Sequence, residues 1–242
     1  MALVSVVVPV YKESIYLKRL LHNLARQTWI FRTEIILCEY EPSGTSAQII
    51  STFHQQYPDV RVRMIEIFEK GIASARNEGI LRAQGQIICN LDADNIFSDD
   101  FCLENLCAPI VEGQAVMTHS RIRIDLSEAR NEKELQKMKM MYVVDQLPFI
   151  ITGICVLKNV WEECGGLRNI DPYEMAAFAL SVFWRYPGKI KKIEEATVLT
   201  SARRTLKEKE LGVLEHTFSR NTAVRGDKII WGDKLGYDTD KT

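Results

Sequence analysis

Residues 60–94, VRVRMIEIFEKGIASARNEGILRAQGQIICNLDAD, contain one complete strand–helix–strand unit. Val60–Phe68 is mostly apolar and predicts a strand that ends shortly before Gly71. Ile72–Ala83 predicts a helix, and Gln86–Leu91 is a second apolar run that ends at a pair of aspartates. Strands that alternate with helices at this spacing predict a parallel sheet with helices on both faces.

The same alternation extends toward the N-terminus. Leu3–Val8 is a β-branched run closed by Pro9, which is typical of a buried parallel strand. Tyr16–Arg26 carries apolar residues at helical spacing. Glu34–Cys38 predicts another strand, and a turn leads from it into a helix that extends through Phe53. The fold class predicted from the sequence is therefore α/β, with a doubly wound, mostly parallel sheet flanked by helices.

The second half of the chain is less regular. Its predicted elements are an alternating strand, a charged amphipathic helix, an apolar strand, a helix and a last strand: Ala115–Ile124, Leu126–Val144, Phe149–Leu157, Glu174–Tyr186 and Ile190–Leu199. A chain of 242 residues fits one α/β domain of the usual upper size, because such domains reach about 250 residues. No repeat or Pro/Ser-rich linker divides it, so we expect one domain over residues 1–204 and a short, polar C-terminal extension over 205–242.

Composition excludes several classes of protein. The 31 Lys and Arg residues are balanced by 32 Asp and Glu residues, whereas a general nucleic-acid binder normally has a basic excess. No stretch approaches the roughly 18–20 apolar residues of a membrane-spanning helix, and the N-terminus lacks the basic region of a signal peptide. The six cysteines form no Cys-x-x-Cys pair, which favours small buried hydrophobes over disulfides or zinc ligands. We expect a reduced, cytoplasmic protein.

Two aspartates follow the predicted strand that ends near Leu91. Asp92 and Asp94 are spaced i, i+2, and their carboxylates could share a hard cation such as Mn²⁺ or Mg²⁺. Ligands of open α/β sheets bind outside the carboxyl ends of the strands, and a divalent ion there would stabilise a diphosphate leaving group. Taken alone, the motif is weak and is more typical of a solvated acidic turn.

A glycine turn opens the helix about fifteen residues upstream. Gly71 and Arg76 lie in the segment Lys70–Gly79, where backbone N–H groups and a cation could bind phosphate or sugar oxygens. The alternative is structural, because small residues also let a helix pack closely on a sheet.

Five segments together resemble glycosyltransferase family 2, which has the GT-A fold and uses nucleotide-diphosphate sugars. In chain order they are Ser5–Glu13, Lys70–Gly79, Asn90–Asn95, Ile151–Lys158 and Trp161–Gly166. The resemblance runs from Ser5 to Arg204. Several ordered motifs at matching spacing are specific, although each alone is weak.

The resemblance implies an inverting transfer of a sugar from a UDP- or GDP-linked donor to a hydroxyl acceptor, with Mn²⁺ or Mg²⁺ as cofactor. The acceptor would be a glycan, a lipid-linked molecule or a protein. Residues 1–110 would form the nucleotide-sugar-binding half, and residues 111–204 the acceptor-side half.

The resemblance also assigns the nucleobase side of the donor site. Pro9, Val10 and Tyr11 correspond to the end of the family's first strand, beside the base, and Glu13 belongs to the same motif. Glu39 stands where the family usually has an Asp that accepts an N–H of the base. Its extra methylene shifts the carboxylate outward and leaves both uracil and guanine open.

The phosphate side follows in the same way. Gly71 opens the binding helix, and Arg76 is similar to the residue near the diphosphate and ribose. Asp92 corresponds to the carboxylate near the ribose and Asp94 to the direct metal ligand, with Ala93 between them. Metal binding is expected at both aspartates.

Two arginines after the last predicted strand extend this set. Arg203 and Arg204 resemble a basic segment that reaches the diphosphate in some members of the family. A solvated surface pair is an equal alternative.

The catalytic base is less clear from the sequence. The family normally supplies it from an adjacent Glu-Asp pair at the start of a helix, and no such pair occurs here. Asp171 with Pro172 is typical of a helix start, and Glu174 completes a capping-box pattern. We predict Glu174 as the base, because a first helical turn can face the cleft, with Asp171 as the second candidate. The other alternative is that the base is lost.

Two other functions stay open at this stage: a nucleotidyltransferase, and a non-catalytic scaffold derived from a transferase. The predicted helix Leu126–Val144, with Met138 and Met141 beside lysines, could dock on a membrane surface. Packing of this helix in the core or in a homodimer is the favoured alternative. The expected location is therefore cytoplasmic, or peripheral at the inner face of the membrane.

Overall fold

A computed structural model describes residues 3–42, 44–140, 153–170 and 174–201, together with the short strands β9 (Ala223–Arg225) and β10 (Lys228–Ile230). The chain divides into two compact units, Met1–Ser201 and Ala202–Thr242. In the second unit, β9 and β10 pair antiparallel. All other elements belong to the first unit.

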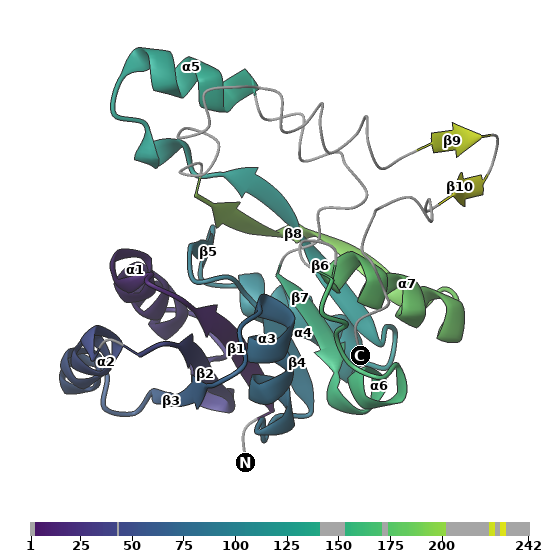
Figure 1. Cartoon of the computed structure of the whole chain (residues 1–242), viewed down its shortest axis with the longest axis horizontal. Coiled ribbons are helices and arrows are strands. Elements are labelled where there is room, and N and C mark those ends of the chain that lie inside the picture. Colours follow the sequence, from purple (N-terminus) through teal and green to yellow (C-terminus); the bar gives the residue numbers. More distant parts are fainter. Residues whose placement is uncertain are drawn as a thin grey trace. The chain divides into compact units, whose positions relative to one another are not determined.

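The first unit is built on an eight-stranded sheet with the order β3-β2-β1-β4-β7-β6-β8-β5 (Figure 1). Strands β3, β2, β1 and β4 are mutually parallel, β7 runs antiparallel to β4 and β6, β8 is parallel to β6, and β5 is antiparallel to β8. The predicted α/β fold class is confirmed, with a mixed second half. The strands are β1 (Val4–Val10), β2 (Thr33–Tyr40), β3 (Arg61–Ile67), β4 (Ile87–Asn90), β5 (Asn95–Phe97), β6 (Met117–Ile124), β7 (Ile154–Leu157) and β8 (Ile190–Thr200).

Helices cover both faces of this sheet. One apolar cluster joins the sheet to α1, α2 and α4, and a second cluster joins it to α3, α6 and α7. The helices are α1 (Ser14–Ala25), α2 (Thr45–Gln56), α3 (Ile72–Leu81), α4 (Cys102–Val111), α5 (Glu132–Met140), α6 (Lys158–Glu163) and α7 (Glu174–Arg185). Among the described residues, none of the helices has the length and apolar character needed to span a membrane.

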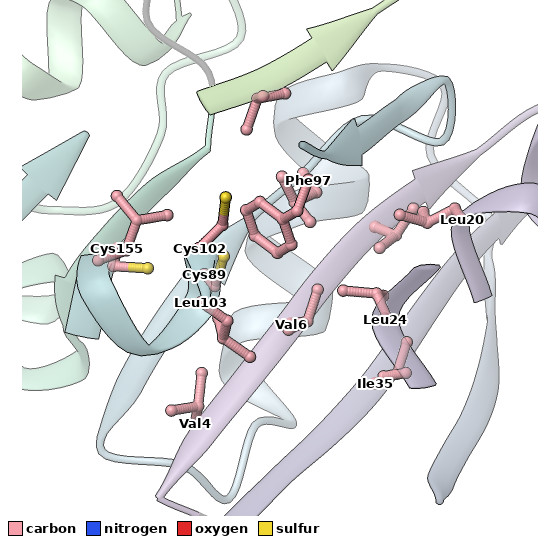
Figure 2. Packing of buried hydrophobic residues seen from close by; sticks show 14 of the residues in the cluster. Val4, Val6, Leu20, Leu24, Ile35, Cys89, Phe97, Cys102, Leu103 and Cys155 are labelled. Carbon is pink, nitrogen blue, oxygen red and sulfur yellow. The ribbon is translucent and has the colours of Figure 1, made fainter. Parts of the chain in front are cut away.

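The apolar strands owe their composition to burial on both faces. Val4, Val6 and Val8 pack in the first cluster, and Val7 packs in the second. A strand covered on both sides needs apolar residues at consecutive positions, which explains the three consecutive valines Val6–Val8. Figure 2 shows part of the first cluster, in which side chains of β1, α1 and β2 gather with Phe97 and three cysteines.

Five of the six cysteines are buried, and all six are free thiols. Burial raises the pKa of Cys38 to about 12, so this thiol stays neutral at ordinary pH. The five buried cysteines therefore fill the core as small hydrophobes, as the sequence predicted.

The structure corrects three local predictions. The predicted helix Leu126–Val144 is interrupted: a 3₁₀ turn at Leu126–Glu128 precedes α5, and residues 141–144 lie outside the described part. The cause is local capping. Asp125 accepts a hydrogen bond from the Ser127 backbone N–H at 3.0 Å, and Asn131 accepts one from the Glu134 N–H at 3.0 Å. Such side-chain bonds end one turn and begin another.

The other two corrections concern an omission and a turn. Neither β5 nor α4 is predicted from the sequence, and the segment Trp161–Gly166, whose glycine pair predicts a turn, begins inside helix α6. The predicted strand Phe149–Leu157 begins at Ile154 in the described residues. Met138 of α5 is fully buried.

Gly79 explains why small residues are needed in α3. A Cβ at this position would lie 2.5 Å from Cys38 Sγ and 2.5 Å from Val7 Cγ1. We therefore expect Gly79→Ala to lower the free energy of unfolding by about 1–3 kcal/mol through overpacking, although alanine is the better helix former. Urea denaturation measures this change. The control is Glu78→Ala, which removes a surface ion pair with Arg82 and should change stability by about 0.5 kcal/mol or less. Equal or higher stability of Gly79→Ala would contradict the close packing.

Candidate functional site

The carboxyl ends of four parallel strands form one edge of the sheet. In the register of the strands, Val10 pairs with Glu39, and Glu39 pairs with Glu66. Asn90, the last residue of β4, pairs with Val7 of β1. Because parallel strands end on the same side, residues that follow them in the sequence converge at this edge, as expected for a ligand site in an α/β sheet.

Arg76 lies at the centre of the candidate site. It is 5% exposed and projects from α3. One guanidinium nitrogen donates to Asp92 Oδ1 at 2.5 Å, and another donates to Glu174 Oε1. Three of the predicted site residues, from α3, the end of β4 and the first turn of α7, are thus joined by one buried cation.

Glu174 occupies the first turn of α7 as predicted, but its side chain is only 6% exposed and faces Arg76. Oε2 of this carboxylate is buried and has no hydrogen-bond partner among the described residues. The sequence could locate Glu174 on the helix but not the ion pair, because Arg76 lies 98 residues away.

A tight turn presents the two aspartates. The Asn95 backbone N–H donates to the Asp92 carbonyl at 3.0 Å, and Asn95 Nδ2 donates to Asp94 Oδ1 at 3.3 Å. The same amide nitrogen donates to Thr200 Oγ1 of β8 at 3.1 Å. Ala93 is buried between the aspartates, which are both half-buried. Asn95 therefore fixes the turn, a function that the motif did not reveal.

These carboxylates suit a metal ion that is shared with a ligand. Within the described ranges, no three His, Cys, Asp or Glu side chains group closely enough to hold a metal ion by themselves. Mg²⁺ at nucleotide sites is commonly held by one or two carboxylates together with phosphate oxygens of the substrate. Asp92 and Asp94 match that donor set, with Asp92 also engaged by Arg76.

A loop closes over the start of α3. Asn77 clamps Leu167 on both sides of its backbone: its Nδ2 donates to the Leu167 carbonyl at 2.8 Å, and its Oδ1 accepts from the Leu167 N–H at 3.0 Å. Gly71 has φ +141°, and a Cβ there would lie 3.0 Å from Asn169 Oδ1. The glycine turn is thus required both by its backbone conformation and by the loop that packs on it.

Aromatic and strained residues lie at the ends of β1 and β2. The rings of Tyr11 and Tyr40 are 5.7 Å apart, and Tyr11 is 45% exposed. Lys12 Nζ lies 4.9 Å from the Tyr11 ring centre. Lys12 and Glu41, the residues that follow these tyrosines, have φ near +54° and +53°. Non-glycine residues rarely adopt this conformation, and they cluster at functional sites when they do.

Contacts at the ends of β1 and β2 shift the pKa values of the Lys12 ammonium and the Tyr40 phenol. A hydrogen bond with Tyr11 raises the pKa of the Lys12 ammonium, so this group stays protonated at neutral pH. Burial, aided by the nearby Glu41 carboxylate, raises the pKa of the Tyr40 phenol, which therefore stays neutral.

Glu39 is buried near the end of β2, one residue before Tyr40. Ser46, in the first turn of α2, donates to Glu39 Oε1 at 2.5 Å, and both residues are at most 4% exposed. The second oxygen, Glu39 Oε2, is buried and has no hydrogen-bond partner within the described residues. The sequence did not predict Ser46 as a residue of the site. Its position after the second strand was the only signal that could have pointed to it.

Unsatisfied polar atoms gather at this edge. In the described part of the chain, four buried side-chain atoms of the site have no hydrogen-bond partner: Glu39 Oε2, Arg76 Nε, Asn90 Oδ1 and Glu174 Oε2. Buried polar atoms in folded proteins are normally hydrogen-bonded. Their concentration at one sheet edge marks a place where a ligand can supply the missing partners.

The remaining predicted residues separate into two groups. Val10 is buried in the apolar core, Pro9 is half-buried in β1, and Glu13 precedes α1, where its carbonyl accepts from the Leu17 N–H at 2.9 Å. Three further predicted residues lie outside the described residues: Asp171, Arg203 and Arg204.

Two bacterial glycosyltransferases are similar in sequence to parts of this chain. It is 29% identical over 190 residues to glycosyltransferase GlyA of Streptococcus pneumoniae, which covers 78% of this chain and 24% of that protein. It is 35% identical over 114 residues to glycosyltransferase GlyG of the same species, covering 47% of this chain and 36% of the relative. The chain thus spans about a quarter to a third of the length of these relatives.

Solved structures share the fold. The mannosyltransferase PcManGT of Pyrobaculum calidifontis, in complex with GDP-Man and Mn²⁺, has a TM-score of 0.62 at 17% identity, covering 81% of this chain and 56% of that one. S. aureus TarS, in complex with UDP-GlcNAc, has a TM-score of 0.65 at 14% identity, covering 83% and 58%. These similarities confirm the GT-A architecture.

A sequence model of one family matches residues 5–166, more than half of the chain. The matched range contains the glycine turn with Arg76 and the aspartates of the sheet edge. This chain belongs to glycosyl transferase family 2.

Proposed function

We propose that this protein transfers a sugar from a nucleotide-diphosphate sugar to a hydroxyl acceptor, with inversion at the anomeric carbon and with Mn²⁺ or Mg²⁺ as cofactor. The observation that carries the proposal is the buried Arg76, which joins Asp92 and Glu174 at a sheet edge rich in unsatisfied polar atoms. Membership of glycosyl transferase family 2 supports it.

The donor would lie along the carboxyl edge of β2, β1 and β4. Tyr11 and Glu39 stand on the nucleobase side, and Gly71 and Arg76 on the diphosphate side. Two related folds carry nucleotide sugars in their complexes, GDP-Man in one and UDP-GlcNAc in the other, which supports this class of donor. Arg203 and Arg204 are proposed to add positive charge to the diphosphate.

Asp94, with Asp92, would hold the divalent ion together with diphosphate oxygens. When bound, the ion offsets the charge of the departing diphosphate. Arg76 would add positive charge from the protein at the same place, because its guanidinium lies against Asp92.

Glu174 is proposed as the general base. As the acceptor hydroxyl oxygen attacks the anomeric carbon, its proton passes to the carboxylate, and the bond to the nucleoside diphosphate breaks. Oε1 is held by Arg76, which leaves Oε2 as the proton acceptor. Asp171 is the second candidate for this role. The acceptor itself is proposed only as a hydroxyl of a glycan, a lipid-linked molecule or a protein.

Asp94→Ala tests the metal site. We expect nucleotide binding in Mn²⁺ to weaken by about 10- to 100-fold, toward the affinity of the wild-type protein in EDTA, because removing a metal ligand costs at least as much as removing a group that supports one. Calorimetric titration with UDP and GDP measures it. The control is Asp100→Ala, a surface carboxylate paired with Arg26. Unchanged affinity of a folded Asp94→Ala protein in Mn²⁺ would remove Asp94 from the site.

The burial of Glu174 favours one second candidate function, a nucleotide-sugar-binding protein without a catalytic base. Such a protein would still bind the donor at Arg76 and Asp92. It would neither hydrolyse the donor nor transfer the sugar. A donor-hydrolysis assay with and without Mn²⁺ separates the two functions.

A further inference from the structure

Asn95 joins the turn that carries the two aspartates to β8. It is 1% exposed, begins β5, and pairs in register with Thr200, the last residue of β8. Its Nδ2 donates to Asp94 Oδ1 at 3.3 Å and to Thr200 Oγ1 at 3.1 Å. Its Oδ1 accepts from the Asp92 backbone N–H at 3.4 Å. One buried amide thus contacts both the turn and the strand.

These contacts match the hydrogen-bonding groups of an amide. A carboxylate only accepts hydrogen bonds and a backbone N–H only donates them, so the side chain between them must offer a donor to Asp94 and an acceptor to Asp92. An aspartate in place of Asn95 would keep the acceptor but would put a third carboxylate against Asp94. Because Nδ2 carries two hydrogens, it can bind Asp94 and Thr200 at once, which links the orientation of the Asp94 carboxylate to the position of the Thr200 hydroxyl.

The end of β8 is itself held by neighbouring elements. The Asp125 backbone N–H donates to the Thr200 carbonyl at 2.9 Å, and Ser201 Oγ donates to Glu128 Oε2 at 2.6 Å. Arg19 of α1 forms ion pairs with both Asp125 and Glu128. These contacts hold Thr200 in place, so its hydroxyl is a fixed anchor for the amide.

We propose that Asn95 and Thr200 are positioning residues, which hold the Asp94 carboxylate in the orientation that binds the divalent ion. The inference rests on the proposed function, because it takes Asp94 as a metal ligand, and it adds β8 as the support of that ligand. Removing a group that orients a metal ligand typically lowers metal affinity by roughly 10- to 100-fold. Neither Asn95 nor Thr200 needs to touch the ion.

The test measures two affinities of the full chain. Electron paramagnetic resonance of free Mn²⁺, at saturating UDP or GDP, gives the affinity for the metal, and calorimetric titration in EDTA gives the affinity for the nucleotide alone. Thr200→Val replaces the hydroxyl by a methyl group of similar size. We expect it to weaken Mn²⁺ binding several-fold and Asn95→Ala to weaken it about tenfold or more, with nucleotide binding in EDTA unchanged.

Two variants of β8 serve as controls. Thr200→Ser keeps the hydroxyl and should retain the wild-type affinity for Mn²⁺. Thr197→Val makes the same replacement three residues earlier on β8 and should also leave this affinity unchanged.

The affinity for Mn²⁺ is the decisive quantity, since a merely structural role of Asn95 and Thr200 would lower stability without a selective loss of metal binding. Wild-type Mn²⁺ affinity in either folded variant overturns the inference and leaves the donor site intact, as does an equal loss in Thr200→Ser or Thr197→Val. Wild-type protein that binds no nucleotide, or binds it without regard to Mn²⁺, overturns the proposed function instead. Where Asn95→Ala does not fold, Thr200→Val decides, because it removes a single hydroxyl and keeps the amide.

Discussion

Arg76→Met is expected to lower the free energy of unfolding by about 3–5 kcal/mol, because it removes a buried cation and leaves two carboxylates without their partner. Glu174 is almost fully buried, and Asp92 is half-buried, so water can compensate only the second. Methionine fills the volume of the aliphatic part of the arginine side chain. The loss of stability therefore reflects the missing charge and not a cavity. Urea denaturation followed by circular dichroism measures the change.

Two companion variants make the result specific. Arg82→Met removes a surface arginine next to the same helix, and we expect a change of about 0.5 kcal/mol or less. The double variant Arg76→Met/Glu174→Gln should be less destabilised than the sum of its single variants, because the uncompensated charge is gone. Additive losses would contradict the ion pair.

The same Arg76→Met substitution should weaken donor binding. The loss of one charge-assisted hydrogen bond corresponds to roughly 10- to 100-fold in affinity. Titration below the melting temperature of the variant separates this effect from instability. Wild-type affinity in a folded Arg76→Met protein would exclude Arg76 from the diphosphate side of the site.

Glu174→Gln is expected to lower turnover by about 100- to 10,000-fold, the usual contribution of a general base. Glutamine keeps the shape and can still accept a hydrogen bond from Arg76, so donor binding should stay within about threefold. The measurement compares the turnover number with the dissociation constant of the donor, across a range of pH. Loss of the acid limb of the pH profile would identify the group as the base.

A matched control variant tests whether the loss of turnover is specific to Glu174. Glu163→Gln removes a surface carboxylate that pairs with Arg185 and should leave turnover unchanged. If Glu174→Gln retains wild-type turnover, Asp171 becomes the base to test. A parallel loss of turnover and donor binding would show that Glu174 acts only by holding Arg76.

The fold of the first half could be predicted because its strands are local and unambiguous. β1 and β4 are buried on both faces, so their apolar runs are continuous, and each is followed by a helix or a tight turn. β5 has only three residues and forms through its pairing with β8, about a hundred positions later. α4 contains Pro109, a residue that argues against a helix in sequence. Both depend on tertiary contacts that periodicity does not report.

The candidate site could be predicted in part for the same reason. Asp92 and Asp94 follow strand β4 directly, so the sheet topology alone brings them to the edge formed by the carboxyl ends of the parallel strands. The partners of these residues are distant in sequence: Glu174 is 98 residues from Arg76, and Leu167 is 90 residues from Asn77. Sequence spacing cannot supply such contacts, and it therefore missed both the ion pair of Glu174 and the clamp of the loop.

The most direct test of the central claim is calorimetric titration of UDP and GDP into the full chain, first in Mn²⁺ and then in EDTA. The sheet edge around Arg76, Asp92 and Asp94 predicts binding of a nucleoside diphosphate that weakens by about tenfold or more when the metal is removed. Binding of neither nucleotide by folded protein, in either condition, would contradict the donor site.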